Sequence, residues 1–354
     1  MVRWLSAKRN TPIGVDIGSR SVKLIQFSPD RARIVESSRW DFTVDDIEQL
    51  AQEERRSQIA QAIRNARVGR RFRGNDAVIC LSDRQLFLQN VRFPKGDSQP
   101  IERLVQQEAA GRVPYGMEET ELRFIEAAEI RHGDQVMREV ILLACHRPVL
   151  DELLSTIEEA GLRPVAVEIE PLALLRGLHR QFRRDDDKLQ RTLLVEIGHS
   201  RTAVVISEGE DLLFVKYLAL GGRQLDEAVA RHLHMSMPEA VALRRNNGDR
   251  RSDQQDPEIA RSVADASRTV IERLAGELSM CVRYHSVTFR GHPLVRLVLG
   301  GGEATPQLLE TLSTRLNLKS ELSDPLRGFE NAPGSAHKGQ WDVASGLALR
   351  EPEL

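Results

Sequence analysis

The chain has 354 residues, of which 41% are hydrophobic and 29% charged, and this length is enough for about two globular domains. Its formal net charge of -2 argues against a general nucleic-acid-binding protein, because such proteins are normally basic. The 3 cysteines are far apart in sequence and predict reduced core thiols in a cytoplasmic protein, rather than a disulfide framework or a zinc site. No stretch has the roughly 20 consecutive apolar residues needed to cross a bilayer, and the start of the chain has too short an apolar run for a signal peptide.

The first informative stretch, residues 13–27, has the pattern of a β-hairpin, with two apolar runs separated by a glycine and a polar tip. Such a turn presents backbone N–H groups, hydroxyls and a lysine, which together suit phosphate oxygens. Asp16 precedes the turn, where its carboxylate would hold Mg²⁺ or its water shell, because hard cations prefer oxygen ligands. For one copy alone, an ordinary hairpin remains the better explanation. The expected phosphate-binding residues are Gly18, Ser19, Arg20, Ser21 and Lys23.

A second stretch, residues 193–207, repeats this design about 180 residues later. Glu196 takes the place of the acid, two residues before Gly198, and a polar tip and another apolar run follow. The duplication predicts two related halves that hold a phosphate between their hairpins. Two ordinary hairpins remain the alternative.

Between the hairpins, the spacing of apolar residues predicts both strands and helices. They are strands at 33–42, 76–82 and 85–93, a helix at 45–67, a helix at 101–110, strands at 121–130 and 136–146, a helix at 149–160, a strand at 164–170 and a helix at 172–182. The charged run 183–188 is the expected boundary between the halves.

The end of the helix at 45–67 is strongly basic. Nucleic acid or lipid would suit this cluster, but a solvated loop is favoured, because no aromatic residues form a ladder through it and the net charge is near zero. The basic residues are Arg64, Arg67, Arg70, Arg71 and Arg73.

The second half carries two further glycine sites. Gly221 and Gly222 precede a predicted helix at 225–233, where amide donors would face a ligand, although a simple turn is equally compatible with the pattern. Three consecutive glycines end a predicted strand at 294–299 and lead to Glu303, so that a flat ring or a sugar could lie against bare backbone.

The other elements expected in the second half are a strand at 211–220, helices at 238–245, 259–285 and 307–316, a polar loop at 246–256, and a closing helix of small residues at 341–350. A glycine inside a helix, such as Gly346 here, lowers helix stability by roughly 1 kcal/mol relative to alanine. We therefore expect Gly346 to be needed for close packing.

Taken together, the hairpins and glycine sites resemble the actin-like ATPase fold of actin, sugar kinases, Hsp70 and the cell-division protein FtsA. Within this superfamily the chain resembles the PilM family of type IV pilus assembly proteins and its type II secretion relatives. Beyond the glycine sites the resemblance rests on residues 107–115, 159–173 and 343–350. It implies an α/β fold of duplicated RNase H-like halves with an FtsA-like inserted subdomain.

The resemblance also implies domains and site residues. The domains are a flexible tail at 1–11, a first half at 12–188 with an insert at about 85–165, a second half at 189–340, and a closing helix at 341–354 that packs back on the first half. Besides the first turn, ATP would be held by Gly198, Thr202, Gly221, Gly222, Glu239, Arg244, Gly300, Gly301, Gly302 and Glu303, and Mg²⁺ by Asp16 and Glu196.

Three positions depart from the family pattern. Glu196 replaces the usual aspartate, Val241 replaces a second acid, and Arg244 replaces a lysine. A lost or lengthened carboxylate weakens metal and ribose contacts. Two alternatives follow: weak binding of ATP and Mg²⁺, or a site that has lost its nucleotide.

The function implied by the resemblance is a scaffold, with at most a slow ATPase activity. It would lie in the cytoplasm at the inner membrane, bind the N-terminal tail of a PilN-like bitopic protein near the insert, contact other platform components and self-associate. The alternative is a catalytic ATPase or small-molecule kinase, which needs an additional carboxylate base at the nucleophile.

Overall fold

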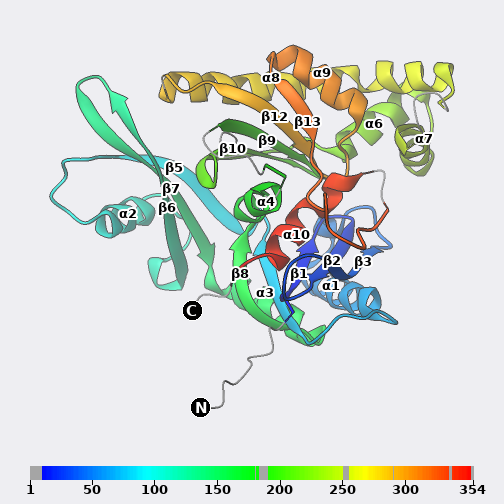
Figure 1. The fold of residues 1–354 in the computed structure, drawn as a ribbon, viewed down its shortest axis with the longest axis horizontal. Coiled ribbons are helices and arrows are strands. Elements are labelled where there is room, and N and C mark those ends of the chain that lie inside the picture. Colours follow the sequence, from blue (N-terminus) through cyan, green and yellow to red (C-terminus); the bar gives the residue numbers. More distant parts are fainter. Residues whose placement is uncertain are drawn as a thin grey trace. The chain divides into compact units, whose positions relative to one another are not determined.

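The computed structural model describes residues 10–179, 181–182, 190–249, 255–289, 291–334 and 337–351 (Figure 1). The predicted charged boundary at 183–188 lies outside these residues, as does the predicted N-terminal tail up to residue 9. The chain divides into two compact units. The first comprises Met1–Phe182, Pro325–Gly334 and Trp341–Leu354, and the second comprises Arg183–Asp324 and Ser335–Gln340.

The first unit contains a five-stranded sheet in the order β3-β2-β1-β4-β8. β1 pairs antiparallel with β2 and parallel with β4, so the predicted hairpin is confirmed at the centre of the sheet. The strands are β1 (Ile13–Ile17), β2 (Ser21–Phe27), β3 (Ile34–Asp41), β4 (Asp76–Leu81) and β8 (Arg163–Ile169). The helices are η1 (Ile47–Gln49), α1 (Gln52–Arg67), α3 (Arg147–Glu159), α4 (Glu170–His179) and α10 (Asp342–Ala348). The short helix η4 (Lys338–Trp341) has its first three residues in the second unit and its last in the first.

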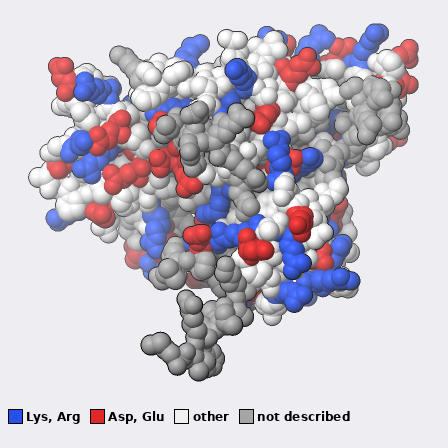
Figure 2. Space-filling view, in the orientation of Figure 1, with Lys and Arg blue, Asp and Glu red and all other residues white. Residues whose placement is uncertain are grey.

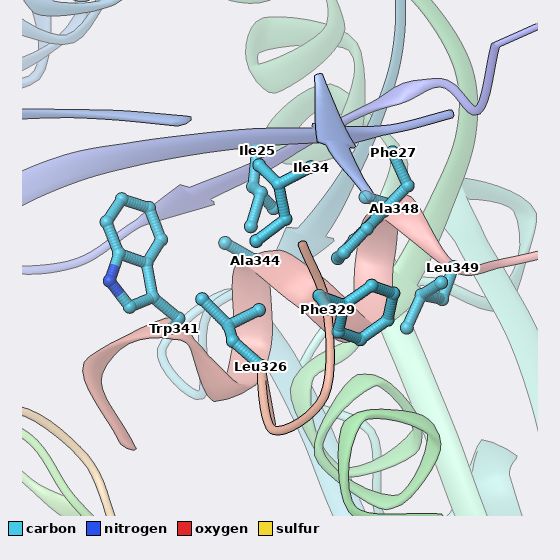
Figure 3. Close-up of a cluster of buried hydrophobic side chains, with 9 residues drawn as sticks. All are labelled: Ile25, Phe27, Ile34, Leu326, Phe329, Trp341, Ala344, Ala348 and Leu349. Atoms are coloured by element: carbon cyan, nitrogen blue, oxygen red, sulfur yellow. The ribbon is translucent and has the colours of Figure 1, made fainter. Parts of the chain in front are cut away.

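The closing helix α10 packs at backbone distance against β1 and α4. A Cβ at Gly14 would overlap the carbonyl oxygen of Ala344, and a Cβ at Gly346 would overlap that of Ala173, so the predicted packing role of Gly346 is confirmed. Side chains from β2, β3, α10 and the segment before it form the surrounding apolar cluster (Figure 3). The cluster consists of Ile25, Phe27, Ile34, Leu326, Phe329, Trp341, Ala344, Ala348 and Leu349.

Between β4 and α3 the chain forms a second sheet in the order β5-β7-β6, named here the insert. Its elements are β5 (Leu86–Pro94), α2 (Ile101–Ala110), η2 (Met117–Glu119), β6 (Thr120–His132) and β7 (Gln135–His146). One face packs on α2, because alternate residues of β7 (Val140, Leu142 and Ala144) share a buried cluster with Ile101 and Val105. Residues 147–165 of the expected insert lie instead in α3 and at the start of β8, which pairs with β4.

The second unit contains a five-stranded sheet in the order β11-β10-β9-β12-β13. As in the first unit, an antiparallel hairpin is flanked by a third antiparallel strand and by two parallel strands, as the duplication predicted. The strands are β9 (Arg191–Ile197), β10 (Thr202–Glu208), β11 (Asp211–Leu218), β12 (Leu294–Gly300) and β13 (Lys319–Leu322). The helices are α6 (Gly222–Leu233), α7 (Met237–Asp249), α8 (Pro257–Thr288) and α9 (Pro306–Leu316).

Two predicted helix boundaries differ most from the structure. The helix expected from residue 45 begins as the separate turn η1, because the Asp46 carboxylate accepts a hydrogen bond from the backbone N–H of Glu48 and starts a helix that ends at once. α7 continues to Asp249, into the segment expected to be a loop. Within the described part of the chain, no helix combines the length and apolarity needed to cross a membrane.

Candidate functional site

The turn between β1 and β2 brings the expected phosphate-binding residues together. The Gly18 N–H donates to the Ser21 carbonyl oxygen at 3.0 Å and closes the turn. Lys23 Nζ lies 2.6 Å from Asp16 Oδ2, and both side chains are largely buried. The candidate metal ligand is therefore an ion-pair partner of the candidate phosphate ligand, and a bound anion or cation would compete with this pair.

The tip of this turn is held by the segment that follows β3. The Ser19 carbonyl oxygen accepts the Ile47 N–H at 2.9 Å, and the Arg20 carbonyl oxygen accepts the Phe42 N–H at 2.8 Å. These bonds fix the backbone of the tip, so its hydroxyls and amides form a preorganised donor set.

The turn between β9 and β10 is joined to the start of α6. Gly198 and His199 accept, through their carbonyl oxygens, the N–H groups of Gly222 and Arg223 at 3.0 and 2.8 Å. The Gly221 N–H donates to Gln224 Oε1 at 2.8 Å. The expectation that the glycine pair offers free amide donors is therefore wrong. The pair instead permits close approach, because a Cβ at Gly221 would lie 2.6 Å from the Gly198 carbonyl oxygen.

The expected residues of β9 and β10 are buried within the sheet. The Thr202 hydroxyl is fully buried and donates to the Leu220 carbonyl oxygen at 2.7 Å. Glu196 is 8% exposed and pairs through its backbone with Ala203 and Gly300. Thr202 therefore has a structural partner in place of a ligand.

The triple glycine lies against the end of β9. Gly301 has a φ of +92°, and a Cβ there would overlap the Ile197 carbonyl oxygen, so this position requires glycine. The same carbonyl accepts the Glu303 N–H at 3.2 Å, whereas a Cβ at Gly302 would meet open space. The loop therefore places the Glu303 side chain directly beside Gly222.

Glu303 belongs to a group of four charges, three of them largely buried, named here the acid–arginine network. Its carboxylate lies 2.7 Å from Arg244 and 2.9 Å from Arg245. Arg244 also donates to Asp226 Oδ1 at 2.6 Å, and Asp226 is 0% exposed. Burial alone would raise the pKa of Glu303, but Arg244 and Arg245 outweigh it and hold that pKa below its usual range. Two expected nucleoside ligands, Arg244 and Glu303, thus neutralise each other.

Sequence reasoning missed Asp226 and Arg245 as members of this network. The amphipathic pattern of α6 could have identified Asp226. It lies three residues before the buried Val229, so the two share the buried face of the helix. Glu239 lies outside the network: its exposed carboxylate accepts two hydrogen bonds from Ser236, which lower its pKa.

These residues fit a nucleotide unequally. The first turn offers a cation, hydroxyls and a fixed backbone, which fits a phosphate. In the second unit the amides, the Thr202 hydroxyl and the charges of Arg244 and Glu303 already have protein partners. Among the described residues, no three His, Cys, Asp or Glu side chains gather into a metal-binding group.

The model of the family described as "Type IV pilus assembly protein PilM" matches residues 14–352. The chain is similar to a chain of a solved "PilM-PilN type IV pilus biogenesis complex", with 24% identity, a TM-score of 0.77, and coverage of 97% of this chain and 99% of that one. It is also similar to the ethanolamine utilization protein EutJ from Carboxydothermus hydrogenoformans, with 15% identity, a TM-score of 0.57, and coverage of 96% and 89%. The fold is that of the actin-like ATPases. Because the family model spans nearly the whole chain, the chain belongs to the PilM family of type IV pilus assembly proteins.

Proposed function

We propose that this chain is a scaffold of the inner-membrane platform of a type IV pilus or related type II secretion system, lies at the cytoplasmic face, and binds the N-terminal tail of a PilN-like membrane protein. The observation that carries the proposal is the end-to-end likeness to a chain of the PilM–PilN complex, over 97% of this chain and 99% of that one. Family membership favours this scaffold over the catalytic ATPase or kinase alternative.

The tail would bind at the insert. β5 and β6 are the outer strands in the order β5-β7-β6, so each has one edge without a strand partner in the described sheet, and an extended peptide can add to such an edge. Half-buried apolar side chains surround the insert's core and would contact apolar residues of a tail. They are Phe87, Leu104, Val113, Met117, Leu122 and Phe124.

The test is a calorimetric titration of the full chain with a synthetic peptide of the PilN-like tail. The double variant Phe87→Ser/Phe124→Ser removes one ring from each outer strand and should weaken binding at least about tenfold, because burying a phenylalanine is worth roughly 1.5–3 kcal/mol. The matched control, Met280→Ser on α8, removes a side chain that is 61% exposed and should leave binding unchanged. Failure of the wild-type chain to bind any PilN-like tail would contradict the proposal.

We further propose that ATP with Mg²⁺ binds weakly as a structural ligand, with its phosphates at the first turn. Bound Mg²⁺ supplies charge neutralisation for the phosphates, whereas Lys23 and the hydroxyls of Ser19 and Ser21 orient their oxygens. The preorganised donor set of the first turn supports ATP binding. The acid–arginine network counts against it, because Arg244 and Glu303 already pair with each other.

Calorimetry with ATP and Mg²⁺ tests this second proposal independently of the tail. Asp16→Ala should abolish the heat of binding, while Asp41→Ala, which removes an exposed acid from β3, should leave it unchanged. If the wild-type chain shows no binding, the chain is a nucleotide-free adaptor and the tail proposal stands separately.

A further inference from the structure

The loop between α1 and β4, residues 68–74, is basic and carries an exposed apolar residue. Val68 is 75% exposed, the largest value among the exposed hydrophobic side chains of the described chain. Arg70, Arg71 and Arg73 follow it and are also exposed, and Phe72 is half-buried. Apolar and cationic groups thus lie side by side on one short surface segment.

Two side chains of the sheet hold this loop by its backbone. The Arg71 N–H donates to Glu36 Oε2 on β3 at 2.9 Å. Gln26 on β2, which is 1% exposed, accepts the Arg73 N–H and donates to the Arg73 carbonyl oxygen, both at 2.8 Å. A buried glutamine with both ends bonded to one residue fixes the loop, so its side chains project from a defined backbone.

The positive charge of the loop is little neutralised. Arg71 and Arg73 have no hydrogen-bonding or ionic side-chain partner within the described part of the chain, and Arg70 has only Glu36, at 3.8 Å. Arg64 and Arg67, at the end of α1, donate to the carbonyl oxygens of Glu159 and Gly161 at 3.0 and 3.1 Å. Both guanidinium groups also donate to side-chain amide oxygens, of Gln61 and Asn75, but no carboxylate of the described residues pairs with either charge.

Together, these side chains form a surface named here the arginine loop. It consists of Arg64, Arg67, Arg70, Arg71 and Arg73 with Val68 and Phe72. Figure 2 shows Lys and Arg atoms gathered at its lower right, over the part of the molecule where Figure 1 draws α1.

We propose that the arginine loop docks on an anionic lipid surface. Each arginine near such a surface contributes about 1 kcal/mol, and an exposed valine and a half-buried phenylalanine can enter the headgroup boundary. A single-stranded nucleic acid would meet the same charges, but base stacking needs several aromatic side chains, and this loop has Phe72 alone. The net charge of -2 argues against binding to a nucleic-acid duplex, because proteins that bind one are normally basic.

The start of the chain is bonded to the same point. Gln26 Nε2, which bonds to Arg73, also donates to the Thr11 carbonyl oxygen at 2.9 Å.

The test is sedimentation of the full chain with vesicles of phosphatidylcholine containing about one third phosphatidylglycerol, and with vesicles of phosphatidylcholine alone. Binding should require the anionic lipid and fall as salt rises, because charges at an exposed surface are screened. Arg71→Gln/Arg73→Gln should lower the partition coefficient about 25-fold, or about fivefold per arginine. Because neither side chain makes a hydrogen bond or ion pair with another described residue, the melting temperature should not change.

The matched control is Arg261→Gln/Arg273→Gln, which removes two exposed arginines from α8 and should bind vesicles as the wild type does. An equal loss in this control, or equal binding to neutral vesicles, would overturn the proposal. Fluorescence anisotropy with a labelled DNA duplex provides the other arm. Binding to the duplex through Arg71 and Arg73, without binding to vesicles, would assign the arginine loop to nucleic acid instead.

Discussion

At the scale of single residues, the acid–arginine network explains why the second unit does not present its expected nucleoside ligands. Arg244 is buried between Asp226 and Glu303, and their charges outweigh its burial and raise its pKa. Arg244 can donate to both carboxylates at once, which a lysine does less well. An arginine at this position therefore favours pairing of the charges within the network.

Glu303→Gln should destabilise the second unit by about 3–5 kcal/mol, because it leaves two arginines with the single carboxylate of Asp226 in a buried site. Urea unfolding followed by circular dichroism measures the loss. Glu310→Gln, which removes an exposed acid from α9, is the control and should change stability by less than about 0.5 kcal/mol. Equal midpoints for the two variants would show that the network contributes nothing.

Acid should weaken the second unit through His285. Burial, and then the charge of Arg191, whose Nη1 lies 3.2 Å from its ring, lower the pKa of His285 to about 4. The unfolded chain takes up a proton near the ordinary pKa of about 6.5, so below that pH the unfolded state binds more protons than the folded state. Stability should fall between about pH 6.5 and 4, by at most about 1.4 kcal/mol per pH unit.

Urea midpoints at pH 7.5 and 5 measure this dependence. His285→Gln removes the titrating group and should flatten the difference, although the variant is less stable at both pH values. His232→Gln, at an exposed position of α6, should retain the wild-type dependence. An unchanged pH dependence in His285→Gln would contradict the assignment.

At the scale of elements, the closing helix depends on backbone contact. Gly346→Ala should destabilise the first unit by about 1–3 kcal/mol, because the added methyl group overlaps the Ala173 carbonyl oxygen and forces α10 away from α4. The control is Gly276→Ala in α8, where a Cβ meets nothing within 4 Å and the better helix former should add up to about 1 kcal/mol. If the melting temperatures of both variants shift in the same direction from that of the wild type, the proposed difference between the two glycines is wrong.

Elements with a local pattern could be predicted from the sequence. Both hairpins are found, and the glycine inside the closing helix was correctly assigned to packing. Pairings distant in sequence were not predictable: β8 joins β4, which places residues 163–165 in the main sheet and not in the insert. The bonds from Gln26 to Thr11 and Arg73 have no periodic signature, because they depend on the finished sheet.

At the scale of the whole molecule, the two units repeat one strand order, and an insert interrupts the first of them. The motif spacing predicted which residues lie at the two turns and in the glycine loop. The hydrogen-bond and ion-pair partners of these residues could not be predicted, because the partners of Arg244, Gly222 and Thr202 are distant in sequence. Repeated architecture, with the charges of Arg244 and Glu303 paired to each other in the second unit, is compatible with a scaffold that relies on a protein partner.

Hydrogen exchange of the full chain, with and without the PilN-like tail peptide, tests the proposed scaffold role most directly. Slower exchange should appear in β5 and β6 of the insert, because a bound tail would cover or extend these outer strands. The backbone of α8 serves as the internal control and should exchange at the same rate in both samples. Protection confined to β5, α2 and β6 would support the proposed role. Protection confined to the second unit, or none with the peptide in excess, would contradict it.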